Sequence, residues 1–127
     1  DNAKHILGSL KKIGRIENKN TSYDIFIELL HHKNKNVRIE AVKNLGKFKD
    51  MYIRESIKLH YKKETNSMVK RECISSLGRQ RSSKLIDFFI MELKEKDPKI
   101  VLQAIRALLV FKSNTDVSQA LKGILNH

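Results

Sequence analysis

The apolar residues of the chain recur at helical spacing, and the segments that carry them alternate between two kinds. Val37, Ala41, Leu45 and Phe48 fall on one narrow stripe of a helical wheel. Second amphipathic stretches, of which residues 23–32 are the first, lie between such segments. No segment alternates apolar and polar residues with period two for long enough to form a strand. The pattern therefore predicts an all-α protein.

The first kind of segment is an internal repeat. It reads VRIEAVKNLG from Val37, VKRECISSLG from Val69 and IVLQAIRALL from Ile100, with a weaker copy, HILGSLKKIG, from His5. The last position of each copy steps by 32, 32 and 31 residues through Gly14, Gly46, Gly78 and Leu109. Because each copy has only one apolar face, the copies cannot be stable alone and are expected to stack on one another.

We expect eight helices of two alternating kinds, named B for the repeated segment and A for the segment between copies. The B helices are placed near residues 2–14, 35–48, 67–79 and 98–111, and the A helices near 22–32, 52–63, 84–95 and 115–126. Side chains that can cap a helix N-terminus precede three of the B helices, namely Asn34, Asn66 and Asp97. Glycines near the helix ends are expected to adopt left-handed caps, where a Cβ is unfavourable.

The small–apolar–x–x–Leu–Gly signature, with the dipeptides Val37-Arg38 and Val69-Lys70, resembles the HEAT repeat in its short, phycobilisome-lyase-like form. The resemblance covers nearly the whole chain and departs from the pattern at Leu109 and at Gly8-Ser9. It implies a right-handed α-solenoid of about four helix pairs whose B helices line the concave side. It implies little about function, because such repeats serve as scaffolds for many partners.

Length and composition restrict the class of protein further. A chain of 127 residues has room for one domain and one core. A single Cys excludes a disulfide scaffold or a multi-thiolate zinc site. No apolar run approaches the ~20 residues needed to span a bilayer, so a cytoplasmic location without a membrane is expected. The unpaired half-repeats at both ends suggest a piece of a larger chain.

The chain has a net charge of +12, and two columns of mostly basic residues lie on the B-helix face opposite the apolar stripe, beside Glu40 and Glu72. One column on that face reads Lys11, Lys43, Ser75 and Arg106, and the next reads Arg15, Lys47, Arg79 and Val110. Six of these eight positions are basic, where 26 basic residues in 127 would give fewer than two. Just past the helix ends, Lys49, Arg81 and Lys112 form an aligned set on one rim.

Stacked like charges repel each other, so a polyanion is a natural partner for this face. A nucleic-acid duplex presents one phosphate every ~1.7 Å along its axis. The basic columns therefore favour a non-catalytic module that docks on double-stranded nucleic acid, DNA first, within a DNA-modifying or repair protein. A basic solenoid of this kind resembles the DNA glycosylases built from HEAT-like repeats, but the chain has no Trp and no acid paired with aromatics to carry their chemistry.

Two other functions compete with this interpretation. A third column on the same face reads Leu7, Ile39, Arg71 and Leu102, and its apolar members would suit a scaffold that binds an acidic or amphipathic protein segment. Binding to phosphate should weaken steeply with salt, whereas an apolar-anchored peptide should be less sensitive. A lyase or isomerase, as among short-repeat relatives, would need a catalytic acid–base pair, and none is visible.

Other polar residues are assigned structural roles. The family resemblance implies an inter-repeat hydrogen-bond ladder in which basic residues bridge to the neighbouring turn, formed here by Arg38, Lys70, Asn34, Asn66 and Asp97. Adjacent His31 and His32 point about 100° apart on a helix and cannot chelate one metal together. Cys73 occupies a small, buried column and is not expected to be a nucleophile. We expect no metal, no cofactor, no small-molecule substrate and no enzymatic activity.

Overall fold

The computed structural model describes residues 3–9 and 23–126, and every regular element within these ranges is helical. Residues 3–9 form a helix, and the elements that follow it are α2 (Asp24–Leu29), α3 (Lys35–Leu45), α4 (Met51–Lys63), α5 (Ser67–Arg79), the 3₁₀ turn η1 (Ser83–Leu85), α6 (Ile86–Glu92), α7 (Pro98–Leu109) and α8 (Thr115–Leu125). No strand occurs in the described ranges, so the prediction of an all-α protein is confirmed.

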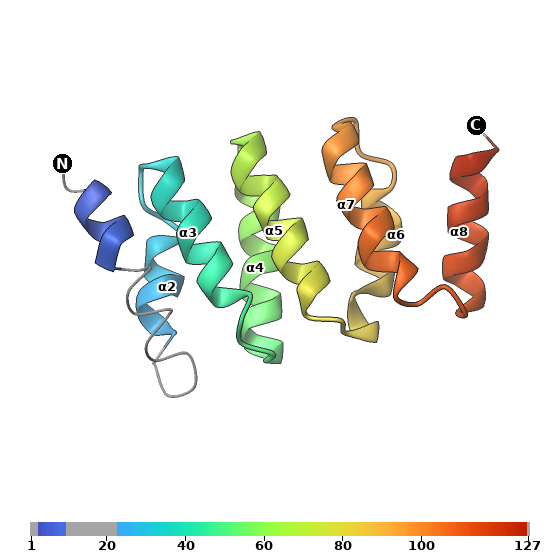
Figure 1. Cartoon of the computed structure of the whole chain (residues 1–127), viewed down its shortest axis with the longest axis horizontal. Helices are drawn as coiled ribbons and strands as arrows, with labels where there is room; N and C mark the ends of the chain where they lie inside the picture. Colours follow the sequence, from blue (N-terminus) through green and yellow to red (C-terminus); the bar gives the residue numbers. More distant parts are fainter. Residues whose placement is uncertain (1–2, 10–22, 127) are drawn as a thin grey trace.

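The helices form two layers that run along the long axis of the molecule (Figure 1). The B helices α3, α5 and α7 lie side by side in one layer, with α5 packed against both of the others. The A helices α2, α4 and α6 lie behind them, and α8 stands at the C-terminal end (Figure 1). The two chain termini are therefore at opposite ends of the stack.

Asn and Asp side chains fix where the helices begin. The Oδ1 of Asn34 accepts hydrogen bonds from the N–H groups of Asn36 and Val37, and Asn66 repeats this arrangement at the start of α5. Asp97 accepts from the N–H of Lys99 immediately before α7. A cap of this kind stabilises a helix by about 1 kcal/mol because it satisfies amides that have no partner inside the helix. The capping prediction is confirmed at all three positions.

The repeated apolar columns form the core between the two layers. Val37, Val69 and Ile100 are buried, and so are the small residues that follow them four positions later: Ala41, Cys73 and Ala104. Each fully buried Leu or Ile contributes about 1.5–3 kcal/mol relative to an exposed one.

The glycine column has a different role from the one predicted. Gly46 ends α3 with φ of −60°, and no glycine among the described residues has a positive φ. A Cβ on Gly46 would lie 2.8 Å from the Cβ of Ser76 on α5, so this glycine allows two helices to touch. The expectation of left-handed glycine caps was wrong, because close helix packing decides the residue at Gly46. Gly14 lies outside the described residues.

The helix ends also differ from the expected bounds. The A helix expected over residues 22–32 spans only Asp24–Leu29, and the one expected over residues 84–95 is divided into η1 and α6. Ser82 starts the 3₁₀ turn by accepting a hydrogen bond from the N–H of Lys84. Within the described part of the chain, none of the helices has the length and apolar character that would be needed to cross a membrane.

Candidate nucleic-acid interface

The basic residues predicted from the B-helix columns lie on the outer surface of the α3–α5–α7 layer. Lys43 of α3 and Lys47, two residues past its end, are exposed, as are Arg79 of α5 and Arg106 of α7. Three of the four lie in the last turn of their helix, where a positive charge interacts favourably with the helix dipole. That interaction stabilises the helix without neutralising the side chain. Lys11 and Arg15 of the same columns fall outside the described residues.

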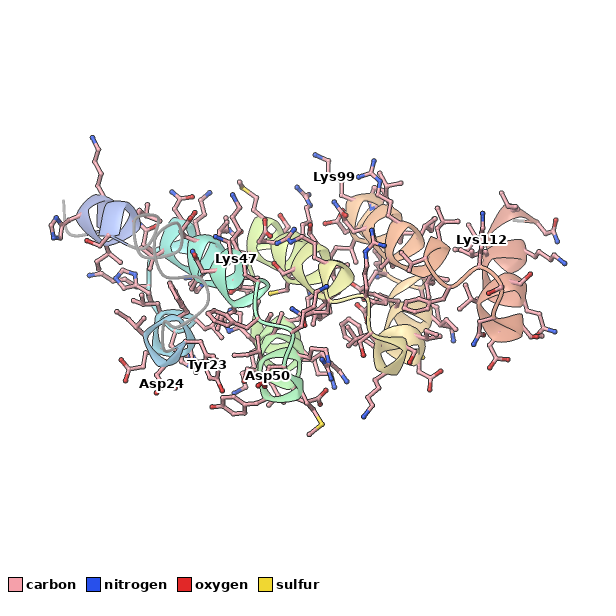
Figure 2. All side chains as sticks on the ribbon, turned by 60° about the horizontal axis from the view of Figure 1, so that its bottom comes forward. Tyr23, Asp24, Lys47, Asp50, Lys99 and Lys112 are labelled. Carbon is pink, nitrogen blue, oxygen red and sulfur yellow. The ribbon has the colours of Figure 1, made fainter. Side chains whose placement is uncertain are left out.

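The rim residues follow directly from the C-terminal ends of the same helices. Lys49, Arg81 and Lys112 come after α3, α5 and α7, respectively, and all three are exposed. Figure 2 shows Lys47 and Lys99 on the side of the B helices, whereas Asp24 and Asp50 lie toward α2 and α4. Charge of opposite sign is thus separated between the two layers at these labelled positions.

Three of the predicted arginines converge on one hollow between α5 and α7. The hollow has a volume of about 220 Å³, and its basic lining consists of Arg79, Arg81 and Arg106. Ser75 and Gln103 add a hydroxyl and an amide, and the remaining lining residues are Ile74, Gly78, Ala107 and Val110. The sequence columns alone did not reveal this open hollow, because it depends on how two helices sit against each other.

Hydrogen bonds fix the orientation of Arg79 at the edge of this hollow. Its Nη2 donates to Oε2 of Glu72 at 3.1 Å and to the hydroxyl of Ser76 at 2.7 Å. Its Nη1 donates to the hydroxyl of Ser75 at 3.0 Å. Glu72 therefore compensates one of the three arginines, while Arg81 and Arg106 form no ion pair with any residue that the structure describes.

Arg81 has the left-handed backbone conformation that was expected for glycine. Its φ is 50°, and it is the only non-glycine residue with a positive φ in the described ranges. Its N–H donates to the carbonyl of Gly78 and so satisfies a group at the end of α5. A Cβ in this conformation costs roughly 1–2 kcal/mol. This strained residue, just past the end of α5, is one of the residues that line the hollow.

The predicted inter-repeat ladder exists in part, with different members. Arg38 forms a bidentate ion pair with Glu64 in the next turn, at 2.9 and 3.0 Å, and also donates to the carbonyls of His32 and Lys33. Asn34 and Asn66 cap their own helices, so the carboxylate of Glu64 replaces the expected amide. The Arg38 guanidinium matches two carboxylate oxygens better than an amide, which offers one acceptor.

The predicted pairing of Lys70 with Asp97 in the next repeat was wrong. Lys70 does not pair with Asp97, because its Nζ lies over the ring of Tyr61, 4.6 Å from the centroid. Its neighbour Arg71 forms the ion pair with Asp97 instead, at 3.2 Å. Hydrogen bonding to the N–H of Lys99 lowers the pKa of Asp97, and Arg71 lowers it further. The basic residue one position later in the helix thus takes the bridging role.

His60 and His31 lie next to each other on the side of Glu64. His60 is buried, its Nε2 lies 2.7 Å from Oε1 of Glu64, and its ring meets that of His31 edge-to-face. Burial lowers the pKa of His60 despite the hydrogen bond to Glu64. Across the described residues, no group of three or more His, Cys, Asp or Glu side chains is placed to hold a metal ion.

The sequence also predicted the surroundings of Cys73. Cys73 is fully buried, and burial raises the pKa of its thiol to about 12, so the prediction that it packs in the core is confirmed.

Of the apolar anchors considered for a protein partner, Leu7 and Ile39 are half-buried and pack against the core. Only Leu102 of that set is largely exposed, at 45%. Two of the three apolar residues of that column are thus used in packing, which leaves Leu102 as its one exposed anchor among the described residues.

Comparison with known proteins gave no matching family model and no matching curated protein.

Proposed function

We propose that this chain is a non-catalytic module that docks on the phosphate backbone of double-stranded nucleic acid, DNA first, through the α3–α5–α7 surface. The observation that carries the proposal is a set of seven exposed basic side chains in α3, α5 and α7 or just past the C-terminal ends of these helices: Lys43, Lys47, Lys49, Arg79, Arg81, Arg106 and Lys112. Among the described residues, only Arg79 of this set forms an ion pair. A surface whose cations lack carboxylate partners gains most from an external polyanion.

The layered stack supports a HEAT-like reading of the fold. Successive helix pairs with buried Val, Ala and Leu columns are what a right-handed α-solenoid requires, and we propose that architecture for the chain. We further propose that the module serves a larger DNA-modifying or repair protein. A scaffold for an acidic protein segment is the less favoured function, because Leu7 and Ile39 are used in the core.

The proposal is tested by fluorescence anisotropy of a labelled duplex of about 20 base pairs, titrated with the protein at several salt concentrations. The logarithm of the association constant should fall linearly with the logarithm of salt, by about 0.9 for each phosphate neutralised. The variant Lys43→Glu/Lys47→Glu/Arg106→Glu should bind more weakly, with a slope smaller by about one for each lost contact.

A matched control carries the same charge change on the other layer. Lys62, Lys84 and Lys94 are exposed residues of α4, η1 and the segment after α6, and their triple reversal to Glu changes net charge equally. This control should bind the duplex more tightly than the B-layer variant. Equal losses in both triple variants would mean that net charge alone drives binding. Absence of binding by the parent protein at low salt would exclude the proposed function.

A further inference from the structure

We propose that the hollow between α5 and α7 is a binding pocket for one phosphate group, held by Arg79, Arg81 and Arg106. The inference rests on the proposed function, of which it would be the most specific contact. The three guanidinium groups come from the last turn of α5, from the left-handed residue after it, and from α7. With a volume of about 220 Å³, the hollow is smaller than the ~300–1,000 Å³ typical of pockets for drug-sized ligands.

The hollow keeps its positive charge because the third copy of the repeat has an amide where the other two copies have a carboxylate. Gln103 occupies the position of α7 that corresponds to Glu40 in α3 and Glu72 in α5. An amide of nearly the same shape therefore stands where the other two copies carry a carboxylate. The result is that Arg106 and Arg81 have no acidic partner among the described residues, whereas Arg79 is paired with Glu72. Three arginines and one carboxylate leave a local charge near +2.

The donors in the hollow match the chemistry of a phosphate group. Guanidinium groups present parallel N–H donors that fit two oxygens of one phosphate, and Gln103 can donate through its amide. The hydroxyl of Ser75 already accepts from Arg79, so its own hydrogen is available to donate. Arg81 retains a backbone conformation that opposes folding, as residues at functional sites often do.

The corresponding positions of α3 and α5 provide an internal comparison. There the three arginines are replaced by Lys47, Lys49 and Ser75, and the carboxylate of Glu72 occupies the place of Gln103. Lysine is a compact charge without the planar fork of arginine, and Glu72 neutralises part of the field. The α5–α7 junction is thus specialised for an anion, while the α3–α5 junction offers only general attraction.

The phosphate could belong to an internal phosphodiester or to the end of a strand. An internal phosphodiester carries one negative charge, and a terminal monoester carries between about 1.5 and 2 at pH 7. Both present oxygen acceptors of the same geometry, so the two sources share the chemistry of recognition. They are distinguished with two duplexes of identical sequence, one carrying 5′-phosphates and one ending in hydroxyl groups.

The decisive variant is Gln103→Glu, which restores the carboxylate found in the other copies. It should weaken duplex binding about tenfold, because it supplies the arginines with an internal partner. The reverse change, Glu72→Gln, releases Arg79 and should tighten binding. Gln119→Glu on the exposed surface of α8 carries the same charge change as Gln103→Glu and should have little effect. Circular dichroism establishes that each variant is folded.

Loss of affinity for both duplexes in Gln103→Glu identifies the internal phosphodiester as the occupant, and loss confined to the 5′-phosphorylated duplex identifies the strand end. Either result supports the pocket. Equal affinities of Gln103→Glu and Gln119→Glu for both duplexes would overturn it, while the steep salt dependence of the parent would leave the proposed function standing.

A second measurement is independent of duplex binding. Pyrophosphate titrated into the ¹⁵N-labelled protein should shift the Nε–Hε resonances of Arg81 and Arg106, and should leave that of Arg54 on α4 unchanged. If the parent binds no duplex but these shifts occur, the proposed function fails and the phosphate pocket stands. If no shift occurs and Gln103→Glu behaves as the control, the pocket is excluded.

Discussion

Gly46 and Gly78 occupy the same column of the repeat but tolerate a side chain to different degrees. A Cβ on Gly46 would meet Ser76 at 2.8 Å from its Cβ and 3.4 Å from its Cα, so backbone as well as side chain obstructs it. A Cβ on Gly78 would meet Ala107 at 3.4 Å, an ordinary van der Waals distance. Gly123 in α8 has nothing within 4 Å. Identical positions in a sequence repeat thus have different structural requirements.

Substitution of each glycine by alanine should therefore change the free energy of unfolding by a different amount, and with opposite sign at Gly46 and Gly123. Gly46→Ala should lower the free energy of unfolding by about 1–3 kcal/mol, because it overpacks the α3–α5 contact. Gly123→Ala should raise it by about 0.5–1 kcal/mol through helix propensity alone, and Gly78→Ala should fall between these two. Urea denaturation followed by circular dichroism measures all three. A gain of stability in Gly46→Ala would contradict the packing role assigned here.

Glu64 makes the stability of the fold depend on pH. Burial alone would raise its pKa, but hydrogen bonds from Arg38, the N–H of Asn66 and His60 outweigh burial and lower the pKa below 4.5. For His60 the charged form is the protonated one, so burial lowers its pKa below 6.5. Both groups bind fewer protons in the folded than in the unfolded state at acidic pH. Their contributions are therefore present at neutral pH and are lost as pH falls.

Stability should fall with pH in two ranges, one due to His60 and one due to Glu64, and a variant of each residue tests its contribution. Stability should begin to fall below about pH 6.5 as His60 becomes protonated in the unfolded chain, and fall further below the ordinary pKa of Glu64. His60→Phe should reduce the first loss and Glu64→Gln the second. Urea midpoints at pH 7.5, 5.5 and 4.0 test this. If Glu64→Gln loses as much stability as the parent between pH 5.5 and 4.0, the assignment to Glu64 is incorrect.

Glu64→Gln should also be costly at neutral pH, by about 3 kcal/mol, because it leaves the partly buried Arg38 without its carboxylate. Arg71→Met should cost less than about 1 kcal/mol, because the Arg71–Asp97 pair is more exposed to solvent. The two bridges between successive turns therefore contribute unequally, although they occupy similar places in the fold.

At the scale of elements, α5 and α8 differ strongly in the number of residues that they bury. α5 packs against both α3 and α7 and buries Val69, Cys73, Ile74, Ser76 and Leu77. Val117 is the only buried residue of α8. A helix with so little buried surface depends mainly on its own capping, which Asn114 provides by accepting from the N–H of Val117. Local opening of α8 should therefore cost far less free energy than opening of α5.

Amide hydrogen exchange should separate these two helices. Protection factors in α8 are expected to be on the order of 100-fold lower than those in α5, because α8 can open without disturbing the core. Exchange followed by NMR at neutral pH measures both helices in one sample. Equal protection in α5 and α8 would show that the chain opens only as a whole.

At the scale of the whole molecule, the net charge of +12 acts on stability and on binding with opposite sign. Exposed cations on the α3–α5–α7 layer repel each other in the free protein, and salt screens this repulsion. The same salt competes with the protein for phosphates in a complex. Ionic strength should therefore stabilise the free protein and weaken its complex with a duplex.

Raising NaCl from 20 to 300 mM should increase the Tm of the free protein by roughly 2–4 °C through this screening. The Lys43→Glu/Lys47→Glu/Arg106→Glu variant, whose three reversals lower net charge from +12 to +6, should show a smaller increase. Thermal melts of both proteins provide the comparison. A larger increase in the variant would show that repulsion on this layer does not limit stability.

Periodicity predicted the elements of this fold because helix formation and capping are local. The spacing of Val37, Ala41 and Leu45 sufficed to place a buried face, and Asn34 and Asn66 sufficed to place helix starts. The basic columns on α3, α5 and α7 followed from the same wheel, and their described basic members are exposed as expected. These properties depend on residues only a few positions apart.

Contacts between residues about 25 to 35 positions apart could not be predicted in this way. The sequence by itself determined the all-α class, the register of the repeat, the N-terminal caps of the B helices and the exposed positions of the basic residues on those helices. Only the tertiary structure decided that Glu64 pairs with Arg38, that Gly46 makes room for Ser76, and that three arginines line one hollow. The physical reason is that these depend on the distance and rotation between neighbouring helices, which the packing of both layers sets together.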